Sequence, residues 1–184
     1  IRKVIARRGA MELAPGDLVN LGYGIANGIS TVAVEEGFVD EVTLTIEQGI
    51  FGGITAGGMD AGAGVNFDAI IEQSSQFDFY DGGGLDIAFL SFAQVDSQGN
   101  VNVSSFGKGP LGPGGFVNIS QGTKRVIFVG TLTTGGLEIV PNGQIGVTLT
   151  KEGRIRKWVP QVKQITFSGQ YALELGQEIY YFTD

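Results

Sequence analysis

The order of elements between residues 17 and 47 is the feature that most limits how this chain can fold. Residues 17–21 predict a short strand, residues 22–28 a glycine loop, and residues 29–36 a helix. A second strand is predicted over 41–47. A parallel pair of strands needs a crossover connection, and a helix between two strands provides one, so these two strands should pair in parallel. We therefore expect a parallel sheet covered by helices.

Buried strands recur further along the chain. Residues 85–92 and 125–129 are apolar runs, which is typical of strands covered on both faces. Residues 93–104 and 138–150 each predict a hairpin, the first with its turn at 97–100. The remaining predicted elements are helices over 1–13 and 66–71, strands over 162–167 and 178–184, and a long glycine-rich loop over 49–66.

The sequence predicts one domain over residues 1–184, because it shows neither a repeat nor a boundary. Hydrophobic residues make up 42% and charged residues 17%, a composition that supports a folded core and argues against disorder. The predicted fold class is α/β. It is an open, largely parallel sheet with flanking helices and added β-hairpins.

The composition also excludes several kinds of function. The chain has no cysteine and no histidine, which excludes thiol nucleophiles, Ser-His catalysis and the usual zinc sites, so no metal site is expected. The net charge of −7 argues against a nucleic-acid partner, which normally meets a basic face. No apolar run approaches the roughly 18 residues that span a bilayer. Residues 1–14 lack a signal-peptide core, so we expect no membrane partner and a cytoplasmic location.

A first candidate binding position is the glycine loop after the first predicted strand. Ligands of open α/β sheets gather at the carboxyl ends of the strands, where such loops begin. The loop Gly22-Tyr23-Gly24-Ile25-Ala26-Asn27 matches a dinucleotide-binding fingerprint only in part, because Asn27 takes the place of the third glycine. A nucleotide-dependent redox function is therefore weakly supported.

A second candidate position is Glu47, which ends the next predicted strand. A carboxylate there is more often a solvated surface group, but no other nucleophile in the chain is supported by a motif. A carboxylate attacks an acyl carbon that is already activated, as in a thioester, and it needs donors for the oxyanion that forms. Gly114 and Gly115 lack side chains and are suited to present such N–H groups, although a structural turn explains them equally well.

Five short motifs follow one another along the chain. They are Val19-Asn20-Leu21-Gly22-Tyr23-Gly24-Ile25, Glu47-Gln48-Gly49, Gly83-Gly84-Leu85-Asp86-Ile87, Gly99-Asn100-Val101-Asn102 and Gly112-Pro113-Gly114-Gly115. In order and spacing they resemble the family I coenzyme A transferases. More narrowly, nearly the whole chain is similar to the C-terminal, β-type half of the acetate/propionate type.

The resemblance implies a transfer of coenzyme A between short-chain carboxylic acids, by a ping-pong mechanism through a glutamyl-CoA thioester. Glu47 matches the family's nucleophile, and Gly115 matches the glycine whose N–H forms part of the oxyanion hole. Asn102 is a weaker candidate for a polar contact near the thioester. Coenzyme A is then a substrate, and no tightly bound cofactor is implied. Contacts with the substrate or with CoA are also implied for Gly22, Gly24, Gly49 and Gly114.

The resemblance also implies partners. The family's active site lies between two homologous halves, of which this chain resembles one. We therefore expect an α-type half or subunit, a homo- or hetero-oligomer, and acyl-CoA and short-chain carboxylates as substrates. The sequence ends at Asp184 within a predicted strand, so truncation at the C-terminus is expected, and the isolated chain is expected to need its partner. Ala26 replaces a proline that many relatives carry, which predicts a less rigid loop.

The residues that would meet the phosphates of CoA are not fixed by these motifs. Local candidates are Lys108, Lys124 and Arg125. A second group is Lys151, Arg154, Arg156 and Lys157, which a solvated surface hairpin also explains.

Two other functions stay open at this point. One is a sugar-phosphate isomerase or sugar-phosphate-binding module of the same broad fold, in which Glu47 would act as a base. The other is a non-catalytic, truncated partner domain. The acids that the leading hypothesis would exchange are not identified by the sequence.

Overall fold

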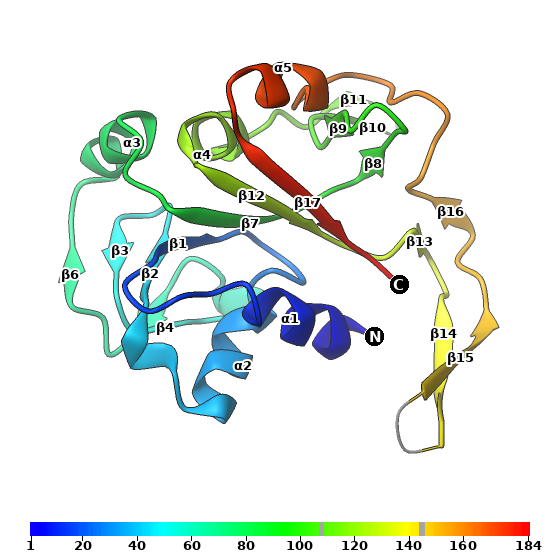
Figure 1. Cartoon of the computed structure of the whole chain (residues 1–184), viewed down its shortest axis with the longest axis horizontal. Helices are drawn as coiled ribbons and strands as arrows, with labels where there is room; N and C mark the ends of the chain where they lie inside the picture. Colours follow the sequence, from blue (N-terminus) through cyan, green and yellow to red (C-terminus); the bar gives the residue numbers. More distant parts are fainter. Residues whose placement is uncertain (107–108, 144–145) are drawn as a thin grey trace.

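The computed structural model describes residues 1–106, 109–143 and 146–184, and its centre is a seven-stranded sheet (Figure 1). The first five strands in spatial order run parallel, and the last two are antiparallel to their neighbours. This arrangement confirms the predicted open, largely parallel α/β sheet. The strands in spatial order are β17 (Glu178–Phe182), β12 (Arg125–Val129), β7 (Ile87–Ser91), β1 (Leu18–Leu21), β2 (Thr43–Ile46), β3 (Ile50–Phe51) and β6 (Ala69–Ile70).

Helices cover both faces of this sheet. In Figure 1, α1 (Arg2–Ala10) and α2 (Gly28–Glu36) lie below it, and α3 (Gln73–Asp81), α4 (Phe116–Gly122) and α5 (Gly169–Glu174) lie above it. Each face has its own apolar core, because successive residues of a strand point to opposite sides. Alternation in β7 shows this division: Ile87 and Phe89 belong to one core, and Ala88 and Leu90 belong to the other.

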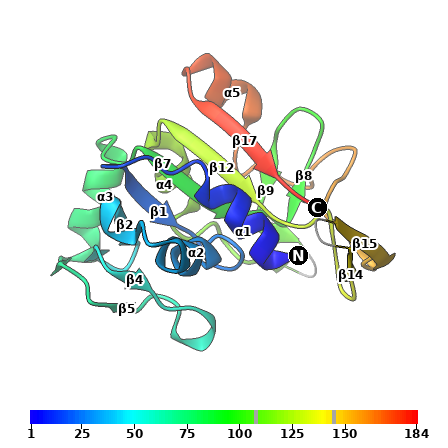
Figure 2. The same ribbon diagram turned by 60° about the horizontal axis from the view of Figure 1, so that its bottom comes forward.

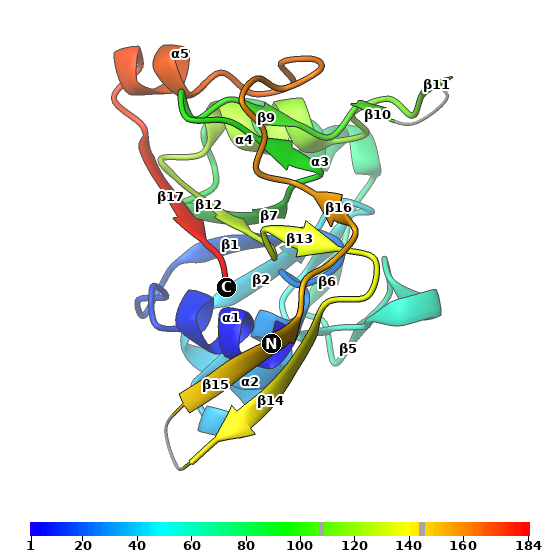
Figure 3. The same ribbon diagram turned by 90° about the vertical axis from the view of Figure 1, so that its right-hand side faces the viewer.

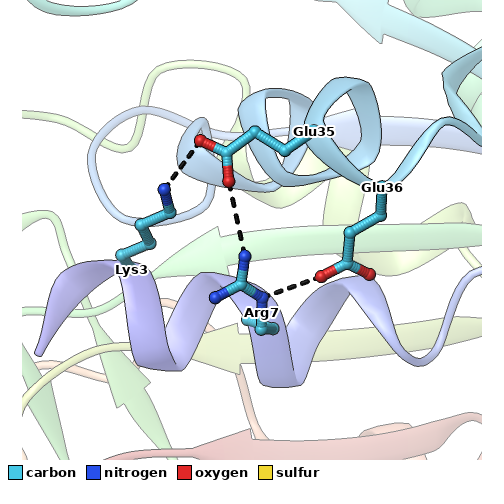
Figure 4. Close-up of polar contacts among 4 residues, drawn as sticks. All are labelled: Lys3, Arg7, Glu35 and Glu36. Atoms are coloured by element: carbon cyan, nitrogen blue, oxygen red, sulfur yellow. Dashed lines mark hydrogen bonds and ion pairs between the residues drawn. The ribbon is translucent and has the colours of Figure 1, made fainter.

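Ion pairs tie the first two helices together (Figure 4). Lys3 Nζ lies 2.6 Å from Glu35 Oε1, and Arg7 Nε lies 2.7 Å from Glu36 Oε1. The hydrogen bond from Lys3 lowers the pKa of Glu35. These side chains are solvent-exposed, so the contacts fix the packing of α1 on α2 more than they stabilise the fold.

Short two-stranded elements surround the main sheet. Figure 2 brings forward β4 (Ile54–Thr55) and β5 (Gly64–Val65), and Figure 3 shows β14 (Glu138–Asn142) and β15 (Gly146–Lys151) extending away from the body. The other elements are β8 (Gln94–Val95) with β9 (Val101–Asn102), β10 (Ser105–Phe106) with β11 (Gly109–Pro110), β13 (Thr133–Thr134) with β16 (Ile155–Arg156), and the 3₁₀ turns Val39–Glu41 and Gly58–Asp60.

The predicted hairpins over 93–104 and 138–150 and the predicted terminal strand are confirmed. The helix predicted over 66–71 is wrong, because this segment pairs as β6 with the edge strand β3. The strand predicted over 162–167 is also wrong, since only Phe167 forms a bridge, to Val101. The stretch 49–66 is a long loop only in part, because it contains β3 and the β4–β5 pair.

None of the helices in the described part of the chain is both long enough and apolar enough to cross a membrane.

Candidate active site

A cavity of about 590 Å³ opens at the carboxyl ends of β1, β2 and β7. Its walls come from the loops that follow these strands and from the start of α4, which is where ligands are expected in a sheet of this kind. The residues that line the cavity include Asn20, Gly22, Tyr23, Glu47, Phe92, Gly114 and Gly115.

Glu47 reaches this cavity from a tight turn. It directly follows β2, and the Gly49 N–H donates a hydrogen bond of 3.0 Å to the Ile46 carbonyl to close the turn. Gly49 has φ +108°, and a Cβ there would overlap the Ile71 carbonyl oxygen, so the turn needs glycine. β3 begins immediately afterwards and pairs back on β2. Glu47 therefore occupies the bend of a short hairpin whose strands are part of the main sheet.

The carboxylate of Glu47 faces Gly115. A Cβ added to Gly115 would overlap Glu47 Oε2 and would lie 2.6 Å from Phe77 Cζ. Glu47 is half-buried, and desolvation by this burial raises its pKa above the ordinary value of 4.5. Within residues 1–106, 109–143 and 146–184, no hydrogen bond or ion pair satisfies the carboxylate, so its oxygens remain available to a ligand.

Gly115 stands opposite this carboxylate, and Gly114 lines the same cavity. Gly115 precedes α4 as its N-cap residue, and Gly114 has φ +56°. Neither backbone N–H donates a hydrogen bond to any part of the chain that the structure describes. Unpaired N–H groups beside a carboxylate are suited to stabilise an oxyanion that forms next to it.

The first glycine loop lies along the same cavity. Gly22 lines it, and a Cβ on Gly22 would lie 3.0 Å from the Phe89 carbonyl oxygen. Gly24 has φ +97° and lines a smaller neighbouring hollow that shares Tyr23 with the main cavity. Close packing at Gly22 and the positive φ of Gly24 therefore favour glycine at these positions, and each position also borders a hollow.

Two of the predicted site residues make contacts that hold the local fold. Gly49 closes the turn that carries Glu47 and does not line the cavity. Asn102 is buried in β9, where its Nδ2 donates to Gln94 Oε1 at 2.7 Å and to the Ser105 carbonyl at 2.9 Å. Its Oδ1 accepts from two backbone N–H groups that follow it. A role for either residue in contact with substrate stays a prediction.

The basic residues proposed for phosphate binding are dispersed. Lys124 pairs with Asp86 at 2.7 Å and Arg125 with Glu178 at 3.5 Å, both at the amino end of β12, away from the cavity. From the second group, Lys151 pairs with Glu138. Lys108 lies outside the described residues.

Lys157 lies against one wall residue of the cavity. Its Nζ lies 4.5 Å from the ring centroid of Phe92, which lines the cavity. Burial lowers the pKa of Lys157. Of the basic side chains in the second group, this one is therefore best placed to approach a ligand.

Helix α3 contributes side chains that were not predicted from the sequence. Phe77 packs against Gly115 beside Glu47, while Gln76 and Tyr80 are buried beneath the turn. The spacing of Phe77 and Tyr80 on one helical face was an available signal, but the polar residues before Phe77 obscure it. In the described ranges, no three acidic side chains are grouped to hold a metal ion.

Comparison with known proteins gives a consistent result. No protein-family model matches the chain. Acetate CoA-transferase YdiF of Escherichia coli (strain K12) is 48% identical over 184 residues, which are 100% of this chain and 34% of that protein. The acetate CoA-transferase subunit beta of the same organism is 33% identical over 135 residues, or 67% of this chain and 61% of the subunit.

The structural comparison agrees. The acyl-CoA transferase YdiF of E. coli O157:H7, solved as a thioester complex with CoA, has a TM-score of 0.89 and 46% identity over 99% of this chain and 34% of that one. The chain thus spans about a third of the length of these YdiF proteins. Identity near one half over its whole length, together with the shared fold, shows that the chain belongs to the family I coenzyme A transferases, as a relative of their β-type half.

Proposed function

We propose that this chain provides the glutamate nucleophile of an enzyme that transfers coenzyme A between carboxylic acids, and that Glu47 is this nucleophile. The observation that carries the proposal is the Glu47 carboxylate, which faces the N-cap residue Gly115 across an open cavity and has no hydrogen-bonding partner among the described residues. A nucleophile and an oxyanion donor are thus side by side.

In the first half-reaction, a Glu47 oxygen attacks the carbonyl carbon of an acyl-CoA. The carbon–sulfur bond breaks, which gives a mixed anhydride and a CoA thiolate. The thiolate then attacks the Glu47 carbonyl carbon, and the donor acid leaves as a carboxylate. The enzyme now holds CoA as a thioester on Glu47.

In the second half-reaction, the acceptor carboxylate attacks the glutamyl thioester and expels the thiolate. The thiolate attacks the acceptor's carbonyl carbon in the new anhydride, which releases the new acyl-CoA and restores the Glu47 carboxylate. Every carbonyl attack places negative charge on an oxygen, for which the free Gly115 N–H is suited. Binding energy from the remote parts of CoA can lower these barriers.

The proposal includes a partner. The YdiF relatives are about three times as long as this chain, and a further relative at 33% identity is a beta subunit. An α-type half or subunit would cover the open side of the cavity and complete the pocket for the acids. Short-chain carboxylates are the proposed substrate class.

The experiment is a transfer assay on the chain combined with an α-type half. We expect Glu47→Gln to lower transfer by at least about 10⁴-fold, since the amide is not a nucleophile. Glu47→Asp should lower it by about 10²-fold, because the shorter arm withdraws the carboxylate by about 1 Å.

The matched control is Glu152→Gln, which alters an exposed glutamate on the far hairpin. It should leave transfer unchanged. Transfer that persists in Glu47→Gln would contradict the proposal. A complex that binds acyl-CoA without transferring CoA would instead support a non-catalytic domain.

A further inference from the structure

A group of buried polar side chains lies beneath Glu47 and has no part in the steps proposed above. Its members are Asn20 of β1, Thr45 of β2, and Gln76 and Tyr80 of α3, and none is more than 1% exposed. They hydrogen-bond to one another and to the backbone of the turn that carries Glu47. We call these four residues the buried polar cluster.

Gln76 connects this cluster to the nucleophile's backbone. Its Nε2 donates a hydrogen bond of 3.0 Å to the Ile46 carbonyl, the carbonyl of the peptide bond that leads into Glu47. The same carbonyl accepts the 3.0 Å bond from the Gly49 N–H that closes the turn. Both acceptor positions of this oxygen are therefore used, one by the turn and one by α3.

Tyr80 fixes Gln76 in turn. Its hydroxyl accepts from Gln76 Nε2 and, at 3.2 Å, from Asn20 Nδ2, and it donates to Thr45 Oγ1 at 3.0 Å. Thr45 Oγ1 in turn donates a hydrogen bond of 2.9 Å to the Val19 carbonyl. Each hydroxyl thus has one defined orientation, and the cluster links α3, β1 and β2 directly under the turn.

Fold stability alone does not account for this cluster. Asn20 Oδ1 and Gln76 Oε1 are buried without a hydrogen-bonding partner in the described part of the chain. Such acceptors are costly, and apolar side chains of the same shape would fill this space at little or no cost. A polar cluster that is partly unsatisfied indicates a requirement other than packing.

We infer that Gln76 and Tyr80 are positioning residues, which hold the Ile46–Glu47 peptide so that the Glu47 carboxylate faces the Gly115 N–H. The inference rests on the proposed function of Glu47. Phe77, on the same helix between these two residues, packs beside Gly115 and Glu47, so one helix sets both the backbone and the surroundings of the nucleophile. Burial raises the pKa of Tyr80, and the negative charge of Glu47 adds a smaller contribution in the same direction.

The test measures the rate of CoA-adduct formation on the chain in complex with an α-type half, for Gln76→Met, Tyr80→Phe and the double variant. We expect kcat to fall by about 10-fold or more, because a misplacement near 1 Å costs up to about 10²-fold, while KM for acyl-CoA changes less than about twofold. The acid midpoint, which is the pH at which the rate is half its plateau value, should also move down toward 4.5. A carboxylate that is no longer held in place is better solvated, and this lowers its pKa.

The matched controls are Gln170→Met and Tyr171→Phe on the exposed face of α5, which should match the wild type. If Gln76→Met does not fold, Tyr80→Phe carries the test, since it removes only a hydroxyl. Unchanged kcat overturns the inference. A fall in kcat with an unchanged acid midpoint also overturns it, because a smaller folded fraction gives that result. If the wild-type complex forms no adduct, the proposed function itself fails.

Discussion

Partial burial of Glu47 has two opposite effects on its chemistry. Desolvation makes a carboxylate more reactive toward a carbonyl carbon, but it also favours the protonated form, which is not a nucleophile. The balance between these effects depends on pH, because the pKa of Glu47 is raised by burial.

We therefore predict an acid limb in the rate of adduct formation. Below the pKa of Glu47 the carboxyl group is protonated and the rate falls, and above it the rate reaches a plateau. Because burial raises this pKa, the midpoint should lie above the ordinary value of 4.5. Single-turnover rates from pH 4 to pH 8 measure it. A midpoint at or below 4.5 would mean that Glu47 is solvated in the working enzyme.

Gly115 gives a second prediction at the level of one residue. A methyl group at this position would overlap Glu47 Oε2 and Phe77, so Gly115→Ala should displace the carboxylate and lower transfer by about 10²–10³-fold. Gly109→Ala is the control, because a Cβ there meets no described atom within 4 Å. Its activity should stay within about twofold of the wild type. Equal losses in the two variants would show that the loop, and not the contact with Glu47, is what matters.

Among the elements, the short hairpin formed by β2 and β3 is the one that presents Glu47, the proposed nucleophile. Gly49→Ala places a side chain at φ +108° and against the Ile71 carbonyl, so we expect the free energy of unfolding to drop by about 2–4 kcal/mol. Gly37→Ala, at φ +76° with open space around it, should cost only about 1 kcal/mol. Urea unfolding of both variants measures the difference. Equal costs would mean that the turn can relax.

The elements that could be predicted from the sequence are those with a regular apolar pattern. Residues 85–92 and 125–129 bury nearly every side chain, so their apolar runs identified β7 and β12. The segments that were not predicted depend on tertiary contacts instead of a local apolar pattern. Residues 69–70 pair with the two-residue strand β3, and α3 contains the buried Gln76, whose Nε2 donates to the distant Ile46 carbonyl. No local pattern contains that information.

The same distinction holds for the candidate site. Glu47 could be singled out because its strand and the following Gly49 are local features. Gly115 was also a candidate, but its contact with Glu47, 68 positions earlier in the chain, depends on the fold. Gln76 was missed because it reaches the turn from another layer of the fold. The motif at Gly99-Asn100-Val101-Asn102 closes the β8–β9 hairpin, whose turn is held by Asp96 Oδ1 as it accepts from the N–H groups of Gln98 and Asn100. Asn102 Oδ1 instead organises the turn that follows β9.

On the whole molecule, the cavity is open to solvent, and two exposed apolar side chains lie on the loops around it. Tyr23 and Leu111 are more than 70% exposed, and both belong to loops that border the cavity. Surface of this kind is typical of a contact with a partner.

We predict that an α-type half binds this surface and that transfer requires it. Sedimentation of the mixture should show a complex, which the double variant Tyr23→Ser/Leu111→Ser weakens. Val140→Ser, on the projecting hairpin, is the control for loss of an exposed apolar side chain. Full transfer by the isolated chain would contradict this prediction.

In the proposed mechanism, CoA becomes attached to Glu47 itself. The most direct measurement is the mass of the complex after incubation with acyl-CoA, followed by digestion and tandem mass spectrometry. We predict one CoA-sized adduct per site, carried by the peptide that contains Glu47 and lost when an acceptor carboxylate is added. An adduct on another residue, or transfer without any adduct, would contradict it.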